Sequence, residues 1–213
     1  MELERRAYAF EGEDEIVVAK RADGRPVIRG YAVVYDRLSL DLGGFRERIL
    51  PGAFDKMLAK RGSKRDLVSY FNHDPNLLLG RESSGTLRVF SDDKGVGFEV
   101  SPPATRADVM ELVTRRDVKG ASFAFTVEKG GEAWASDERG GTIREIREAQ
   151  MYELGPVVTP AYPSTSAAVA MRSYEAWLAA QSEQPEPAAP AVERTALRGV
   201  AAAWAAILRL RGA

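Results

Sequence analysis

Short runs of hydrophobic residues alternate with polar turn residues over most of this chain. From residue 7 to about residue 172, stretches rich in Val, Ile, Phe and Tyr are separated by Gly, Pro, Asp and Asn. This pattern is typical of short β-strands joined by turns. Asp23-Gly24 and Lys94-Gly95 each lie between two β-type runs and predict hairpins. We therefore expect an α+β fold, built as a β-barrel of mostly antiparallel strands with a few surrounding helices.

Two segments have the sequence features of helices. Residues 50–62, LPGAFDKMLAKRG, have a proline near the start and a glycine at the end. Residues 102–120, PPATRADVMELVTRRDVKG, open with two prolines, carry apolar residues on one stripe and stop at a glycine. The second helix leads directly into a strand, ASFAFTVE, at residues 121–128.

The composition changes after Arg172. Residues 173–195 are rich in Ala, Pro and Glu, which is typical of an extended linker. Residues 196–213 place apolar residues at helical spacing on one face, which predicts an amphipathic helix. We therefore expect a folded domain over residues 1–172, a linker over 173–195 and a C-terminal helix over 196–213 that docks on a partner protein.

The overall charge and the absence of cysteine exclude several classes of function. Thirty basic and 31 acidic residues leave a net charge of −1, so no strong field attracts nucleic acid or an acidic membrane. The chain has no cysteine, which excludes disulfides, thiolate nucleophiles and the common zinc sites. The amino terminus is charged where a signal peptide is apolar, and residues 200–208 are too short an apolar run to span a bilayer. We expect a cytoplasmic protein without cofactor or metal.

The only histidine, His73, lies in the stretch YFNHDP at residues 70–75. One imidazole cannot form a metal coordination shell, but it is all that a serine nucleophile needs as a base. In the strand ASFAFTVE, the alternation buries Phe123 and Phe125 and turns Ser122 away from the core, beside residues too small to cover it. In MYELGP, the same alternation places Glu153 on a face of the same kind as that of Ser122, with Tyr152 and Leu154 inward.

These residue types suit acyl transfer. A serine hydroxyl is a weak nucleophile, and an imidazole can take its proton and return it to the leaving amine. A carboxylate fixes the imidazole tautomer and stabilises the imidazolium. Taken singly, however, Ser122 also fits a solvent-facing strand, His73 a surface turn, and Glu153 an ordinary carboxylate.

Other classes of enzyme have little support. A metal site made only of carboxylates, such as Asp36, Asp41 and Asp92, has no recognisable spacing. A glycosidase needs only two carboxylates, and nothing in the sequence selects a pair. The glycine pairs at 43 and 130 fit neither a phosphate loop nor a dinucleotide fingerprint.

Several sequence blocks, taken in order, resemble the prohead protease family of tailed phages. The blocks are GYAVVYD, FRERILPGAFDKML, YFNHDP, KGASFAF and MYELGPVVTPAYPSTSA, and the resemblance extends from about residue 28 to residue 170. These enzymes are serine proteases of capsid maturation and are similar in fold to the herpesvirus assemblins. The resemblance implies that His73 is the general base and Ser122 the nucleophile.

Assemblins use a second histidine, which this chain lacks, so an acid must orient His73. The resemblance implies Glu153, because the family block around MYELGP has its acid at this position. The family block commonly has serine two residues later, where this chain has Gly155. Our order of preference for the acid is Glu153, then Glu148, then Asp74. Backbone amides are expected to form the oxyanion hole. The candidates for these amides are Gly43, Gly44, Arg115, Arg116 and Gly155.

The function implied by the resemblance is a prohead maturation endopeptidase. It would cleave the major capsid protein or a scaffold protein, and itself, inside the assembling procapsid in the host cell. The resemblance leaves self-association open and requires neither nucleic acid nor membrane. The alternative is a catalytically inactive β-barrel that serves as a scaffolding or assembly module.

Overall fold

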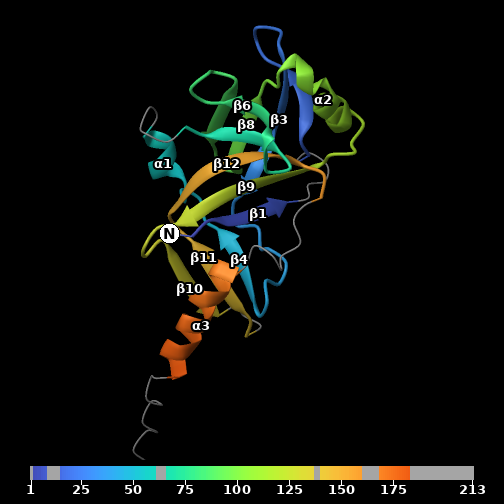
Figure 1. Cartoon of the computed structure of the whole chain (residues 1–213). Coiled ribbons are helices and arrows are strands. Elements are labelled where there is room, and N and C mark those ends of the chain that lie inside the picture. Colours follow the sequence, from blue (N-terminus) through green and yellow to red (C-terminus); the bar gives the residue numbers. More distant parts are fainter. Residues whose placement is uncertain (1, 9–14, 61–65, 137–139, 160–167, 183–213) are drawn as a thin grey trace, which may run out of the picture. The chain divides into compact units, whose positions relative to one another are not determined.

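The computed structural model describes residues 2–8, 15–60, 66–136, 140–159 and 168–182 (Figure 1). The chain divides into units of residues 1–177 and 178–213. Of the second unit, only residues 178–182, at the end of a helix, are described. None of the described helices combines the length and the apolar character that crossing a membrane requires.

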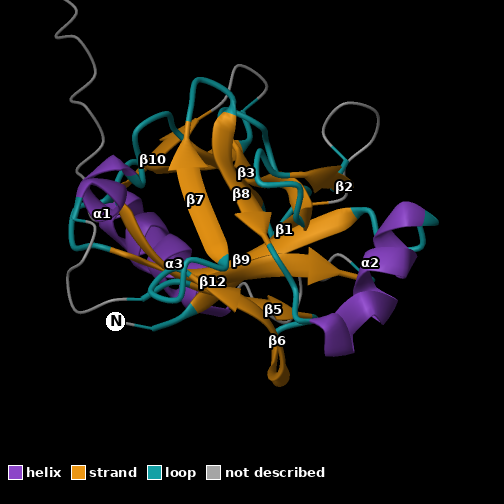
Figure 2. Ribbon diagram, turned by 90° about the horizontal axis from the view of Figure 1, so that it is seen from above, coloured by secondary structure: helices purple, strands orange, loops and turns teal. Residues whose placement is uncertain are grey.

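Strands dominate the described part of the chain, as Figure 2 shows. The strands are β1 (Glu4–Tyr8), β2 (Val17–Lys20), β3 (Pro26–Val34), β4 (Phe45–Ile49), β5 (Val68–Phe71), β6 (Asp74–Arg81), β7 (Leu87–Ser91), β8 (Gly95–Val100), β9 (Gly120–Val127), β10 (Glu132–Ser136), β11 (Thr142–Ile146) and β12 (Ala149–Val157). The helices are α1 (Asp55–Ala59), α2 (Ala107–Thr114), which follows a 3-10 turn at Ala104–Arg106, and α3 (Ala168–Ser182). The α+β class with mostly strands is confirmed.

The described strands form three sheets rather than the barrel that the sequence predicted. Their orders are β1-β9-β12-β5-β6, β10-β11-β4 and β2-β3-β8-β7. No barrel closes among the described strands, because β1 and β6 end the five-stranded sheet without pairing with each other. Most pairs are antiparallel, but β12 pairs with β5 and β11 with β4 in parallel.

Both hairpins predicted from turn residues are present, as β2–β3 and β7–β8. Gly24 has a φ of 81°, a value that costs glycine little and explains its place in the first turn. Helix α2 lies within the predicted segment and buries Val109 and Val113. Helix α1 is shorter than predicted, because residues 51–54 form turns before it begins.

Helix α3 overlaps the start of the predicted linker. The sequence assigned residues from 173 onward to a linker, but α3 continues from Ala168 to Ser182. Tyr174 stacks on Trp134 of β10 with ring centroids 5.4 Å apart, and Trp177 stacks on the same indole at 5.9 Å. These contacts tie the start of the expected linker to the β10-β11-β4 sheet. The helix predicted at 196–213 lies outside the described residues and stays a prediction.

The main core lies on one face of the five-stranded sheet. Phe123 and Phe125 of β9 are fully buried and stack on each other, with ring centroids 5.1 Å apart. Leu154 of β12 and Phe54 are buried in the same cluster. This packing fixes the position of β9. It therefore also fixes the opposite face of the strand, on which Ser122 lies.

Candidate active site

His73 lies in a two-residue turn between β5 and β6. Phe71 pairs with Asp74 across this turn, and both Asn72 and His73 have positive φ, 53° and 61°. Positive φ at both central residues is the geometry of a type I′ hairpin turn, in which asparagine is favoured. His73 thus lies in a turn, as the turn-forming residues around it allow.

Asn72 fastens this turn to the end of β12. Its backbone amide donates a hydrogen bond to the carbonyl of Pro156 at 3.1 Å. Its side-chain Oδ1 accepts one from the amide of Val158 at 2.9 Å. Two bonds to a neighbouring strand hold the turn, and hence the imidazole of His73, in place over the sheet.

Ser122 lies near the middle of the same sheet, on the face away from Phe123. On β9 it is opposite Ala7 of β1 and Gly155 of β12. The predicted alternation is correct, but the expectation that small neighbours leave the serine uncovered is wrong. Ser122 is 0% exposed, because β1, β12 and the His73 turn surround it.

Glu153 lies on the face of Ser122, as the alternation predicted, next to an irregularity in β12. The register between β12 and β9 shifts between Met151 and Glu153, so that Tyr152 has no partner in the ladder and Glu153 pairs with Ala124. Tyr152 was expected to point inward, yet its hydroxyl lies 3.2 Å from Oγ1 of Thr126, a residue on the Ser122 face. A bulge of this kind lets two successive residues share one face of a strand.

The three predicted residues lie in series. Oγ of Ser122 is 2.5 Å from Nε2 of His73, and Nδ1 of His73 is 2.8 Å from Oε1 of Glu153. The side chain of His73 is 20% exposed and that of Glu153 is 11% exposed. The imidazole therefore bridges the hydroxyl and the carboxylate at the edge of the protein interior.

The two other candidates for the orienting acid, Asp74 and Glu148, have other partners. Oδ1 of Asp74 accepts hydrogen bonds from the amide and the side chain of Asn76. Glu148 pairs with Nζ of Lys56 at 2.6 Å. Neither contact involves His73, so of the three candidates Glu153 is the one in contact with the imidazole.

The environment of Glu153 keeps its carboxylate ionised. Burial by itself would raise the pKa of Glu153, but the hydrogen bond and charge of His73 and the charge of Arg5 together outweigh it and lower that pKa below its usual value. Nε of Arg5 lies 3.3 Å from Oε1 of Glu153, the oxygen that also contacts His73. An ionised acceptor beside Nδ1 favours the tautomer that leaves Nε2 free to accept a proton.

The hydroxyl of Ser122 has a second neighbour, the backbone carbonyl of Arg6. The distance between Oγ and this oxygen is 2.8 Å. Since the hydroxyl has one proton, it donates either to Nε2 of His73 or to the Arg6 carbonyl. When it donates to Arg6, Nε2 contacts Oγ only as a donor, and the serine is then not activated.

The amides considered for an oxyanion hole are largely engaged. Those of Gly43 and Gly44 donate to Asp41, and those of Arg115 and Arg116 donate to the carbonyls of Glu111 and Val113. These four amides are thus hydrogen-bonded to nearby residues of their own segments and do not form an oxyanion hole in this conformation.

The backbone at Gly155 leaves no room for a side chain. A Cβ there would lie 2.0 Å from the carbonyl oxygen of Tyr70. Glycine is therefore the residue that fits the backbone of this chain at position 155.

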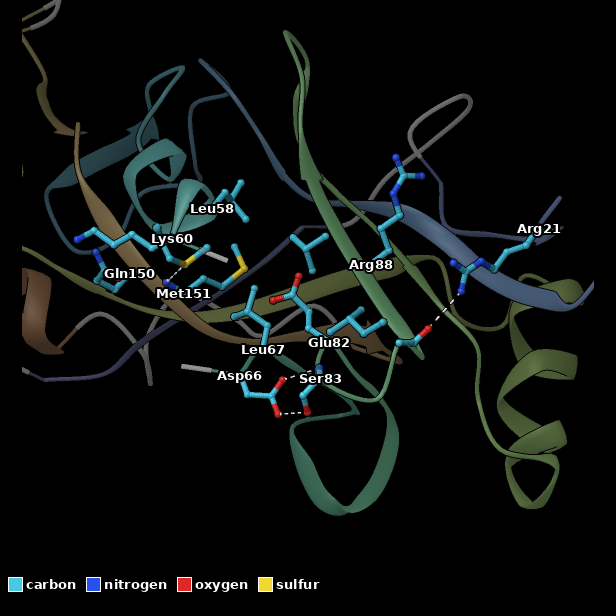
Figure 3. A pocket seen from close by; sticks show the side chains of 14 residues that line it. Arg21, Leu58, Lys60, Asp66, Leu67, Glu82, Ser83, Arg88, Gln150 and Met151 are labelled. Atoms are coloured by element: carbon cyan, nitrogen blue, oxygen red, sulfur yellow. Dashed lines mark hydrogen bonds between the residues drawn. The ribbon is translucent and has the colours of Figure 1, made fainter. Parts of the chain in front are cut away.

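A separate pocket of about 510 Å³ lies near α1 and β7 (Figure 3). Apolar side chains, including Leu58, Leu67 and Met151, line it beside the charged residues Arg88 and Asp66. Asp66 accepts hydrogen bonds from the amide and the hydroxyl of Ser83. None of the residues lining this pocket is Ser122, His73 or Glu153, so the pocket is not part of the candidate site.

Sequence reasoning missed the contribution of β1. Arg5 contacts Glu153 and the Arg6 carbonyl contacts Ser122, yet the segment ELERRAY is mostly charged and has no strand-like hydrophobic pattern. The role of Asn72 as an anchor was also missed. Its preference for positive φ was the available signal, but its partners on β12 are more than 80 residues away.

A hydroxyl, an imidazole and a carboxylate linked in this order define the arrangement of the serine hydrolases. Residues 14–179 match the family model described as caudovirus prohead serine protease. The chain therefore belongs to the prohead serine protease family of tailed phages. No curated protein and no solved structure matches the chain. The expected likeness to the herpesvirus assemblins accordingly stays a prediction.

Proposed function

We propose that the protein is a serine endopeptidase in which Ser122 is the nucleophile, His73 the general base and Glu153 the orienting acid. The observation that carries this proposal is the pair of close contacts between Oγ of Ser122 and Nε2 of His73 and between Nδ1 of His73 and Oε1 of Glu153. Membership of the prohead protease family supports the same assignment.

The chemistry follows from these positions. Nε2 of His73 takes the hydroxyl proton as Oγ of Ser122 attacks the carbonyl carbon of a peptide bond. The imidazolium, stabilised by Glu153, then gives this proton to the leaving amine, and an acyl-serine ester remains. Water, deprotonated by the same imidazole, hydrolyses the ester and regenerates the serine.

The substrates are proposed from the family. A prohead protease acts where the capsid assembles, which supports the major capsid protein or a scaffold protein as substrate inside the procapsid in the host cell. Cleavage of the enzyme's own chain is part of the proposal. The segment 196–213 is proposed to dock the protease on capsid or scaffold protein, through the apolar stripe that its sequence predicts.

A serine-reactive fluorophosphonate probe tests the proposal. The wild-type protein should be labelled, and mass spectrometry should locate the adduct on Ser122. Ser122→Ala should abolish the labelling, whereas Ser136→Ala, at an exposed serine of β10, should not. Cleavage of a capsid-protein peptide by the wild type then separates a protease from an esterase. A wild-type protein that neither labels nor cleaves would favour the inactive scaffolding module.

A further inference from the structure

Strand β1 occupies one edge of β9, the strand that carries Ser122. It pairs antiparallel with β9 over its whole length, from Glu4 opposite Phe125 to Tyr8 opposite Ala121 (Figure 1). The other side of β9 is paired with β12. Both edges of β9 are thus paired and Ser122 is fully buried, so Oγ has no exposed surface for a peptide carbonyl to reach in this arrangement.

The nucleophile already contacts a peptide carbonyl, that of Arg6 on β1. The hydroxyl of Ser122 donates to the oxygen of this carbonyl, 2.8 Å away. A carbonyl that receives the hydroxyl proton as a hydrogen bond is not positioned for attack, because attack needs the lone pair of Oγ directed at carbon and the proton directed at Nε2. The Arg6 carbonyl of β1 therefore accepts a hydrogen bond from the Ser122 hydroxyl but is not attacked by it.

Besides the backbone pairing with β9, the side chains of β1 are held mostly by ion pairs. Glu4 and Arg6 are buried and bond to Arg144 of β11 and Glu47 of β4. Buried ion pairs specify a position well but contribute little net stability, since the desolvation penalty offsets the attraction. Tyr8 adds an aromatic contact to Phe123, with ring centroids 6.2 Å apart.

Charge balance allows β1 to separate. Glu4 and Arg6 bond to each other, so the departing strand carries its own ion pair. Glu47 and Arg144 also bond to each other and stay behind as a second pair. Arg144 also keeps Glu132, and Glu153 loses Arg5 but keeps His73. No buried charge is therefore left without a partner, and a lone buried charge is what makes breaking such clusters costly.

We propose that β1 is an internal blocking strand and that Ser122 becomes accessible only when β1 separates from β9. The side of β9 thus exposed receives an extended segment of the substrate in place of β1, through the backbone groups that β1 occupies. This inference rests on the proposed protease function. It also supplies a way for the enzyme to be held inactive until assembly favours the open form.

A reversible disulfide between β1 and β9 tests the inference. Directly opposed residues of an antiparallel pair have Cα separations within the range that disulfides accept. Because the chain has no cysteine, Tyr8→Cys with Ala121→Cys forms a single defined bridge. Oxidation should lower both fluorophosphonate labelling of Ser122 and peptide cleavage by about tenfold or more, and dithiothreitol should restore both.

A matched bridge elsewhere provides the control. Arg88→Cys with Glu99→Cys joins β7 to β8, a directly opposed pair in another sheet, and its oxidation should leave both rates unchanged. Equal rates for the oxidised and reduced forms of the β1–β9 variant would overturn the blocking role. Complete absence of labelling at Ser122 in both the wild type and the folded Tyr8→Ala protein is a different result, which removes the proposed function instead.

A second variant covers the case in which the double variant does not fold. Tyr8→Ala removes the aromatic contact of β1 with Phe123 and should speed the labelling of Ser122. Circular dichroism would establish that the variant is folded. Unchanged or slower labelling by a folded Tyr8→Ala protein would contradict the inference.

Discussion

Nδ1 of His73 lies 2.8 Å from Oε1 of Glu153, although 80 residues separate the two along the chain. Asp74, the immediate neighbour of His73, bonds to Asn76 instead. The acid that faces the imidazole is thus set by the pairing of β12 with β9 and β5, and by the turn that carries His73.

Substitution of each candidate carboxylate by its amide tests which one orients His73. Glu153→Gln should lower kcat by up to about 10⁴-fold, because an amide supports the wrong imidazole tautomer. Asp74→Asn and Glu148→Gln should change kcat little, since these carboxylates bond to Asn76 and Lys56. Steady-state rates on one capsid-derived peptide provide the comparison. A larger loss for Asp74→Asn than for Glu153→Gln would transfer the role to Asp74.

The serine and the histidine should act as one unit. Ser122→Ala and His73→Ala should each lower kcat by about 10⁴- to 10⁶-fold, and the double variant should be little worse than either. The basis is the 2.5 Å contact between Oγ and Nε2. Single-turnover cleavage measures the residual rates, with thermal unfolding as the check on folding. Substantial cleavage by Ser122→Ala would exclude the serine mechanism.

The turn at Asn72 offers a separate test of positioning. Asn72→Ala removes the bond to the Val158 amide and places a residue with little tolerance for positive φ at 53°. Asn72→Gly removes the same bond but keeps the backbone conformation. Both variants should lose activity, and the alanine variant should lose more stability, by about 1 kcal/mol. Equal kcat in the wild type and both variants would show that the anchor does not position His73.

The buried carboxylate of Glu47 should make stability depend on pH. Burial would raise its pKa, but Arg6 and Arg144 outweigh this and hold the pKa below the usual 4.5. The unfolded chain then takes up a proton first, so this contribution to the free energy of unfolding is complete above about pH 4.5 and is lost as pH falls through the folded-state pKa.

Glu47→Gln measures this contribution. The variant leaves Arg6 and Arg144 with fewer buried partners and should lose about 3–5 kcal/mol of stability at neutral pH. It should also show a weaker decline in stability on acidification than the wild type. Urea unfolding from pH 7 to pH 3 gives both quantities, with the exposed Asp93→Asn as control. Parallel pH profiles for Glu47→Gln and wild type would contradict the assignment.

Two truncations define the boundary of the folded domain. Removing residues 183–213 should leave peptide cleavage and the melting temperature nearly unchanged, because α3 ends at Ser182. Removing residues 168–213 also takes away Tyr174 and Trp177, which stack on Trp134, and should lower Tm by about 5 °C or more. Differential scanning calorimetry of the two forms decides this. A stable shorter form would restore the boundary first expected near residue 172.

Local pattern was sufficient for the features that depend on neighbours in the chain. The two hairpins, helix α2 and the opposite faces of Phe123 and Ser122 follow from turn residues and from periods of two or 3.6. The candidates His73, Ser122 and Glu153 were also proposed from sequence, because the order of motifs along the chain resembles that of a family.

Only the tertiary structure decided which of these residues meet and what covers them. Alternation in MYELGP placed Glu153 on the correct face, but it did not show that Glu153 meets His73 or that a bulge brings Tyr152 to the same face, because both depend on the partner strands. The burial of Ser122 depends on β1, whose charged sequence does not read as a strand. Its charges are accommodated by Glu47 and Arg144, which lie far along the chain. Sequence determines local conformation through neighbouring residues, whereas the contacts that complete and cover this site join segments whose pairing only the folded sheets establish.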